Sequence, residues 1–245
     1  MTAASYIRYE LRRMLRNRRF FLFSLGFPLL LYFLIATPNR HEKDLGGSGI
    51  SAPMYFMIGL AAFGAMNGVM GTGARVAAER VIGWNRQLRI TPLSARVYFR
   101  AKILSAYATA GMTIALLYGS GAALGVRLSL PTWLEMTGLL LVGLVPFVAL
   151  GLLLGHLVNA DAIGPAIGGM TALFGFFGGV WFPIAANGLL HDVALALPSY
   201  WLVQASRVGV GGDGWGATAW LVVALWTLAL VGLACGLAYD VRLQP

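Results

Sequence analysis

The run from Leu45 to Ala74 is 30 residues long and contains no charged side chain. About 20 consecutive apolar residues suffice to cross the hydrocarbon core of a bilayer as a helix. Six stretches of this kind occur, so the sequence predicts an all-α membrane protein with six transmembrane helices in one domain over residues 1–245. Pro146 predicts a kink in the fourth span. The predicted spans are residues 20–36, 53–73, 103–126, 133–158, 163–182 and 217–239.

Composition supports the membrane assignment. Only 11% of the residues are charged, whereas soluble domains carry about 25%. The net charge of +9 could suggest a nucleic-acid partner, but the basic residues flank apolar spans and do not line one soluble face, so none is expected. Cys235 is the single cysteine, which excludes an intramolecular disulfide and a cysteine-based metal site. No metal site is expected.

The basic residues are distributed unevenly between the two sides of this arrangement. An alternating six-span topology places 14 of the 18 Lys and Arg residues on one side. They precede the first span, fill the loop between the second and third spans, and include Arg242 in the tail. Because basic loops remain in the cytoplasm, both termini are predicted to be cytoplasmic.

The residues before the first span have a helical pattern. Apolar and basic residues fall on different faces, which predicts an amphipathic helix lying on the cytoplasmic surface of the membrane lipid. The alternative is an ordinary basic anchor for the first span. The apolar face holds Ile7, Leu11, Met14 and Leu15, and the basic face holds Arg8, Arg12, Arg16 and Arg19.

The segment from Pro183 to Gly216 is apolar but interrupted by polar residues. Helical spacing continues up to Pro198, and Ser199 could cap a second helix over Tyr200–Val210. Neither piece is long enough to span. We therefore expect two short re-entrant helices that enter the membrane from the outside and are shielded by protein.

Motifs for catalysis or nucleotide binding are missing from the sequence. A phosphate-binding loop needs Lys after Gly, and the two lysines, Lys43 and Lys102, stand in other contexts. No catalytic constellation is recognisable, so the chain is not expected to be an enzyme or to hold a cofactor. The spans also lack a carboxylate at mid-depth that could couple to protons or sodium. Energy should therefore come from outside the membrane.

The loop between the second and third spans is the only sizeable cytoplasmic surface. Pro92 cannot extend a preceding helix, so we predict a short coupling helix over Val76–Leu88 and a second stretch, Ala95–Lys102, that leads into the third span. Glu79, Arg80 and Arg86 are expected to be exposed on the coupling helix. The alternative is a solvated basic loop with no partner.

Two segments resemble the ABC-2 type permeases, the membrane subunits of bacterial exporters of drugs, lipids and polysaccharides. The first is "AERVIGWNRQLRITPLS", in which the matching residues are Glu79, Arg80, Gly83, Leu88, Thr91, Pro92, Leu93 and Ser94. The second is "GGVWFP" at Gly178–Pro183 followed by "LPSYWLVQASR" at Leu197–Arg207. The stretch "VIGWN" departs from the family, which often carries another acid and Thr there.

The resemblance implies a permease subunit that exports an amphipathic or hydrophobic substrate, drug-like, antibiotic or lipid-like, across the bacterial cytoplasmic membrane. A second permease chain, identical or related, and two copies of a separate ATPase subunit are implied, with ATP and Mg bound by the ATPase. The residues expected to couple the permease to the ATPase are Glu79, Arg80, Gly83, Trp84 and Arg86.

The end of the fifth span supplies candidates for the substrate path. Phe174, Phe177, Trp181 and Phe182 are spaced to share a helix face, and we expect them to form an apolar outer gate; an interfacial aromatic belt is the alternative. Small residues allow close approach of helices, so Gly175 and Gly179 are predicted to contact the second permease chain.

A membrane-embedded sensor or immunity protein that binds a ligand without moving it is the alternative function. An intramembrane enzyme is a more distant one. A neighbouring gene that encodes a phosphate-binding loop would favour the transporter, and a histidine kinase gene without an ATPase would favour the sensor.

Overall fold

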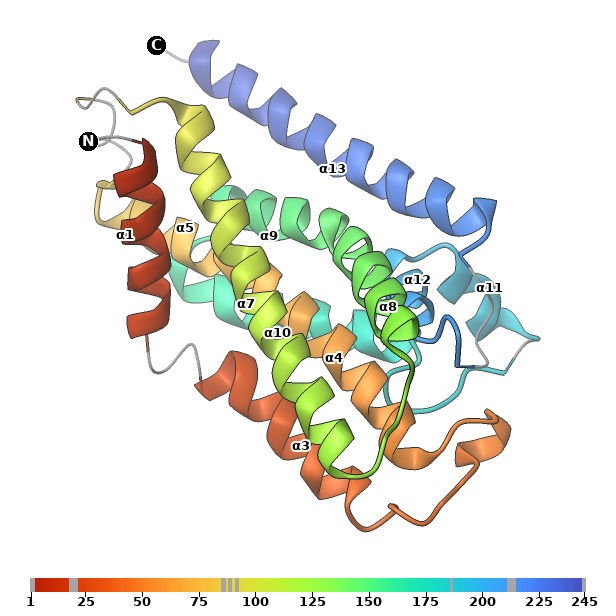
Figure 1. Cartoon of the computed structure of the whole chain (residues 1–245). Coiled ribbons are helices and arrows are strands. Elements are labelled where there is room, and N and C mark those ends of the chain that lie inside the picture. Colours follow the sequence, from red (N-terminus) through yellow and green to blue (C-terminus); the bar gives the residue numbers. More distant parts are fainter. Residues whose placement is uncertain are drawn as a thin grey trace.

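The computed structural model describes residues 3–17, 22–84, 87, 90, 93–185, 187–210 and 215–243. This part of the chain is helical and contains no β-strand (Figure 1). In chain order the elements are α1 (Ala3–Arg16), the π-helical turn η1 (Leu22–Gly26), α3 (Phe27–Ala36), the 3-10 turn η2 (Leu45–Gly47), α4 (Ala52–Met70), α5 (Thr72–Val81), α7 (Ala95–Ala123), α8 (Leu130–Gly143), α9 (Val145–Leu157), α10 (Ala160–Phe177), α11 (Leu189–Leu195), α12 (Pro198–Ala205) and α13 (Ala217–Leu243).

Within the described part of the chain, five helices are long and apolar enough to cross a membrane, which supports a multi-pass membrane protein. They cover Ala52–Val81, Ala95–Ala123, Leu130–Leu157, Ala160–Phe177 and Ala217–Ala234. The first predicted span is represented by a shorter apolar helix over Ser24–Ala36. The prediction of six complete crossings therefore stays a prediction.

Helix α4 forms the centre of the bundle, with α3, α7, α9, α10 and α12 packed around it. Nearly all of its residues are buried, including Tyr55, Met57 and Met66. An apolar helix that is buried all round suits this central position. The uncharged run from Leu45 to Ala74 thus provides much of the core.

Glycines set how closely α5 and α9 cross. A Cβ atom on Gly73 would lie 2.0 Å from the Gly151 carbonyl oxygen, and one on Gly155 would lie 2.6 Å from the Gly73 carbonyl oxygen. These distances leave no room for a side chain at the crossing. Small residues four apart therefore pack helices within this one chain.

Proline and glycine set the limits of helices in the fourth and fifth predicted spans. The fourth is divided into α8 and α9 at Leu144, just before Pro146, which confirms the predicted kink. Helix α10 ends at Phe177, five residues earlier than predicted. Gly179 has a φ of +70°, and the Val180 amide donates to the Gly175 carbonyl at 3.1 Å. This left-handed glycine cap terminates the helix.

The segment after α10 contains two short helices, α11 and α12, as predicted. Helix α12 begins at Pro198 and ends at Ala205, so the predicted limits of Tyr200–Val210 and the Ser199 cap are wrong. Proline is favoured in the first turn, where its missing amide hydrogen is not needed. Trp201, Leu202 and Val203 are buried.

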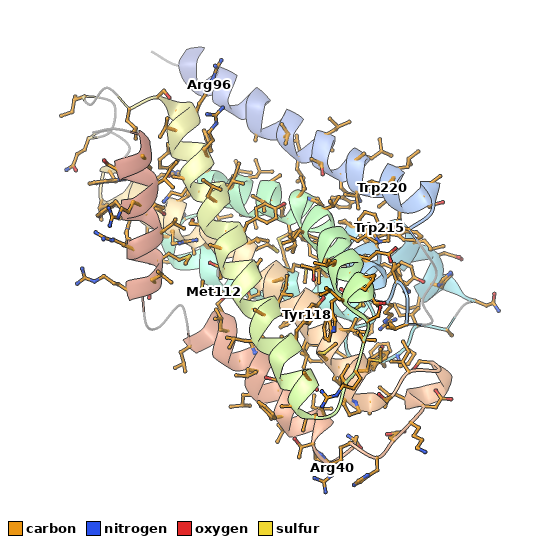
Figure 2. The ribbon with its side chains drawn as sticks, viewed as in Figure 1. Arg40, Arg96, Met112, Tyr118, Trp215 and Trp220 are labelled. Carbon is orange, nitrogen blue, oxygen red and sulfur yellow. The ribbon has the colours of Figure 1, made fainter. Side chains whose placement is uncertain are left out.

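Helix α1, the first turn of α7 and the last turns of α13 lie at one end of the bundle, here called the basic end (Figure 1). The turn after α3 and helices α11 and α12 lie toward the other, here called the opposite end. Arg96 marks the basic end and Arg40 the opposite end (Figure 2).

Helix α1 packs on the start of α7. Tyr6, Glu10 and Met14, spaced four residues apart, form its buried face, and the Thr109 hydroxyl lies 3.0 Å from the Met14 sulfur. Leu15, also predicted to face lipid, is 53% exposed, so Met14 departs from that prediction and Leu15 does not. The apolar residues of α1 therefore divide between a protein-facing side and an exposed side, which corrects the single lipid face.

Candidate functional site

Four charged side chains and one tyrosine form a cluster where α1, α5 and α7 meet at the basic end. Its members, named here the charge cluster, are Glu10 and Arg13 of α1, Glu79 of α5, and Tyr98 and Lys102 of α7. Helical spacing brings each pair on α1 and α7 to one face, because residues three or four apart are neighbours.

Glu79 is the centre of the charge cluster and is fully buried. Its Oε1 atom accepts from Lys102 Nζ at 2.6 Å and from Arg13 Nη1 at 2.6 Å. Its Oε2 atom accepts from the Tyr98 hydroxyl at 2.8 Å. Three donors thus satisfy one carboxylate, which is the condition for keeping an ion away from water.

Lys102 links the two acids of the charge cluster, Glu10 and Glu79. Its side chain is fully buried, and Nζ donates to Glu10 Oε1 at 2.7 Å as well as to Glu79. Within the charge cluster two acids and two bases balance each other, while Arg75 of α5 adds a positive charge that interacts with Glu10 and Glu79. A buried ion set of this kind is costly to break, because removing one member leaves the others unpaired.

The environment of α1 shifts two pKa values. Burial, followed by the Glu10 carboxylate, raises the pKa of the Tyr6 phenol above its usual value. Burial alone would lower the pKa of Arg13, but Glu79 and Glu10 outweigh burial and raise it. Arg13 therefore remains charged at any physiological pH, and Tyr6 remains neutral.

The structure corrects the expected exposure of Glu79. Val76–Leu88 was predicted to form one separate helix, but α5 ends at Val81 and continues α4 with only a bend at Gly71. Glu79 therefore lies on the inner face of a long helix. The prediction failed because the sequence shows a lone acid among basic residues but not the Lys102 across from it.

Arg80 is exposed and contacts the end of α9. Its Nη1 atom donates to the Gly155 carbonyl at 3.1 Å and also to the His156 carbonyl. A guanidinium at a helix C-terminus satisfies carbonyls that lack an intrahelical partner. Arg80 thus fixes the end of α5 to the end of α9.

The turn after α5 holds two more of the predicted coupling residues. Gly83 has a φ of +70°, which permits the chain to reverse, and a Cβ there would meet nothing within 4 Å. Trp84 is half-buried and close to the Tyr6 side chain. Arg86 lies outside the described residues, as do Leu88, Thr91 and Pro92 of the matching motif.

A second buried cation lies toward the opposite end. Arg207 Nη2 donates to the Gly179 carbonyl at 2.8 Å, and its guanidinium lies 4.5 Å from the centre of the Tyr55 ring. The Tyr55 hydroxyl donates to the same carbonyl at 2.7 Å. These three residues, named here the Arg207 cluster, join α4 to the segments that follow α10 and α12.

The aromatic residues proposed as an outer gate do not share a helix face. Phe174 is buried against Phe147, with ring centres 5.3 Å apart. Trp181 and Phe182 lie beyond the end of α10. The ring of Trp181 packs against that of Phe63, with ring centres 5.2 Å apart. The assumed geometry failed because Gly179 reverses the chain before Trp181.

Gly175 and Gly179 have their neighbours within this chain. A Cβ on Gly175 would lie 3.0 Å from the Phe63 ring, and one on Gly179 would lie 3.3 Å from Ile184. Each glycine thus has a close neighbour inside the chain, and the expected contact with a second chain stays a prediction. Both belong to the internal packing that carries the Arg207 cluster.

Sequence reasoning did not identify Lys102, Glu10, Tyr98 or Arg207 as functional candidates. A signal was available, because an acid within an amphipathic helix and a lysine at the start of a span both require partners. Among the described residues, no group of three His, Cys, Asp or Glu residues could hold a metal ion. The ion pairs of the charge cluster link α1, α5 and α7, which suits it to joining helices.

Comparison with known proteins identifies the family of the chain. The profile of the ABC-2 type transporter family matches residues 4–210, and the chain belongs to this family. It is also similar to a protein of Bacillus subtilis (strain 168) named "Putative transport permease YvfS", with 28% identity over 196 residues that cover 78% of each chain. The chain is thus a transporter permease subunit of a family that works with an ATPase subunit.

Proposed function

We propose that this chain exports an amphipathic or hydrophobic substrate, and that the charge cluster transmits the movement of the ATPase into the membrane helices. The observation that carries the coupling proposal is Glu79, which joins three elements at a single carboxylate. It lies at the end of α5, immediately before the loop, and its donors come from α1 and from the start of α7.

The position of the loop makes this arrangement effective for coupling. Residues 82–94 connect α5 to α7, and both helices are held to α1 at the charge cluster. A partner that moves the loop would therefore move the three helices together. Val81, Ile82 and Ile90 are large apolar residues at or beside the loop that are 65–88% exposed. Such residues provide an apolar surface for a soluble subunit.

Several finer expectations belong to the same proposal. The basic end faces the cytoplasm under the positive-inside rule. Two permease chains and two ATPase subunits assemble, and the ATPase binds ATP and Mg. Phe177, Trp181 and Phe182 stay candidates for an outer gate, whereas Phe174 supports it from inside. Membership of a transporter family favours this function over a sensor or immunity protein.

Orientation is tested with single cysteines in a Cys235→Ser background. Gln87 and Asn187 are both exposed, and they lie in segments proposed to face opposite sides. A membrane-impermeant thiol reagent added to intact cells should label a cysteine at position 187 and leave one at position 87 unlabelled. Labelling at position 87 alone would contradict the proposed orientation.

Export is tested in everted membrane vesicles that contain the chain and its ATPase. A fluorescent amphipathic dye should accumulate inside them when ATP is added. A variant ATPase that cannot hydrolyse ATP is the control. ATP-dependent uptake into right-side-out vesicles instead would mean import. Stable association with the ATPase, without movement of any of a panel of amphipathic dyes, would oppose the proposed substrate class.

A further inference from the structure

We propose that α1 carries a binding site for the headgroup of an anionic phospholipid. The site is a pocket of about 500 Å³ lined by Tyr9, Arg12, Arg13, Arg16 and Asn17. Residues 9, 12, 13 and 16 follow the spacing that places side chains on one face of a helix. This inference does not depend on the transported substrate or on the ATPase.

The charge of the pocket selects an anion. Its described lining includes three guanidinium groups and no carboxylate. The nearest acids on the neighbouring face, Glu10 and Glu79, are already engaged by Lys102 and Arg13. Arginine binds phosphate oxygens in a planar, bidentate geometry, and the Tyr9 hydroxyl can supply a further donor.

The surroundings favour a lipid phosphate over a free one. Exposed apolar residues begin soon after the pocket: Leu22, Phe27, Leu30 and Leu34 are 66%, 45%, 61% and 64% exposed. Phe27, Leu30 and Leu34 share one face of α3, by their spacing of three and four. Five residue steps separate Asn17 from Leu22, a reach of at most about 18 Å. A phosphate in the pocket can therefore belong to a molecule whose acyl chains lie along α3.

Arg13 connects this site to the charge cluster. Its Nη1 atom bonds Glu79, while 36% of the side chain is exposed. A guanidinium has five N–H donors, so Arg13 can contact a phosphate and Glu79 together. Lipid binding would then add a second anion to the residue that holds α1 on α5.

The test uses the purified full-length chain in a neutral detergent and native mass spectrometry. Phosphatidylglycerol and phosphatidylcholine with identical acyl chains are the two probes. The chain should bind phosphatidylglycerol more tightly. In Arg12→Gln/Arg16→Gln its affinity should fall about 25-fold, at roughly fivefold per arginine. Both side chains are exposed, so the fold should persist.

The matched control is Arg96→Gln/Arg100→Gln. It removes two exposed arginines with the same spacing at the same end of the bundle, and it should leave phosphatidylglycerol binding within about twofold of the unmodified chain, because these residues do not line the pocket. An equal loss in both double variants would show a general effect of net charge and overturn the site. Equal affinity for phosphatidylglycerol and phosphatidylcholine would also overturn the site.

Two further results would assign the arginines to another ligand. If millimolar inorganic phosphate displaces phosphatidylglycerol completely, the pocket is a free-phosphate site and the lipid proposal fails. If Arg12→Gln/Arg16→Gln binds lipid normally but no longer retains the ATPase subunit, the face docks protein.

Discussion

Lys102 and Glu79 form a 2.6 Å ion pair in which neither side chain is exposed. The pair joins the start of α7 to the end of α5, and Glu10 and Arg13 extend it to α1. Buried ions are retained only where each has a partner. The pair therefore holds both sides of the loop in fixed positions.

Glu79→Gln should lower stability substantially. The change leaves Lys102 and Arg13 with Glu10 as the only acid of the charge cluster, and breaking a buried pair costs about 3–5 kcal/mol. The unfolding midpoint in detergent measures the effect. Glu42→Gln, at an exposed acid, is the control and should change little. Equal midpoints for the two variants would contradict the buried pair.

A double-mutant cycle of Glu10→Gln and Lys102→Met should show strong coupling. Together the two changes remove one acid and one base and leave Glu79 with Arg13 and Tyr98. The double variant should therefore be more stable than the sum of the single losses predicts, by about 0.5–3 kcal/mol. Additive losses would mean that the 2.7 Å contact does not exist in solution.

Alkaline pH should destabilise the chain through Tyr6. Its pKa is raised by burial and by Glu10, so the folded state favours the neutral phenol. This contribution is fully present below the usual pKa of about 10 and is lost as pH rises above it. Tyr6→Phe should weaken the fall in unfolding midpoint above pH about 10, and Tyr9→Phe, at an exposed position on the same helix, is the control.

Gly73→Ala should disrupt the α5–α9 crossing. The added methyl would lie 2.0 Å from the Gly151 carbonyl, and overpacking a core costs about 1–3 kcal/mol. Gly164→Ala is the matched control, because a Cβ there meets nothing within 4 Å. It should be neutral or raise stability by up to about 1 kcal/mol. A tolerated Ala at position 73 would mean that the helices cross farther apart.

Much of the fold could be predicted because it depends on local pattern. The apolar runs predicted the long helices, and Pro146 predicted the break between α8 and α9. The end of α10 depended on a left-handed Gly179, which a hydropathy pattern does not reveal. The charge cluster was missed for a related reason: Glu79 and Lys102 are 23 residues apart, and only the return of α7 along α4 brings them together.

The position of Glu79 also changes how its role is tested. Exposed charges can be replaced with little effect on folding, but Glu79 is buried and its loss affects stability. A charge-balanced variant, Arg13→Gln/Glu79→Gln, removes one base and one acid and keeps the Lys102–Glu10 pair. It removes the ion pair between α1 and α5, and it should destabilise the fold less than Glu79→Gln alone does.

The most direct measurement is ATP hydrolysis by the permease–ATPase complex in lipid nanodiscs, with Arg13→Gln/Glu79→Gln compared with Arg127→Gln/Glu42→Gln. The second variant removes an exposed base and an exposed acid of the opposite end. If the charge cluster couples the subunits, the first variant should retain the ATPase but lose about fivefold or more of its permease-dependent hydrolysis, and the second should match the unmodified complex. A folded first variant with unchanged hydrolysis would contradict the coupling role.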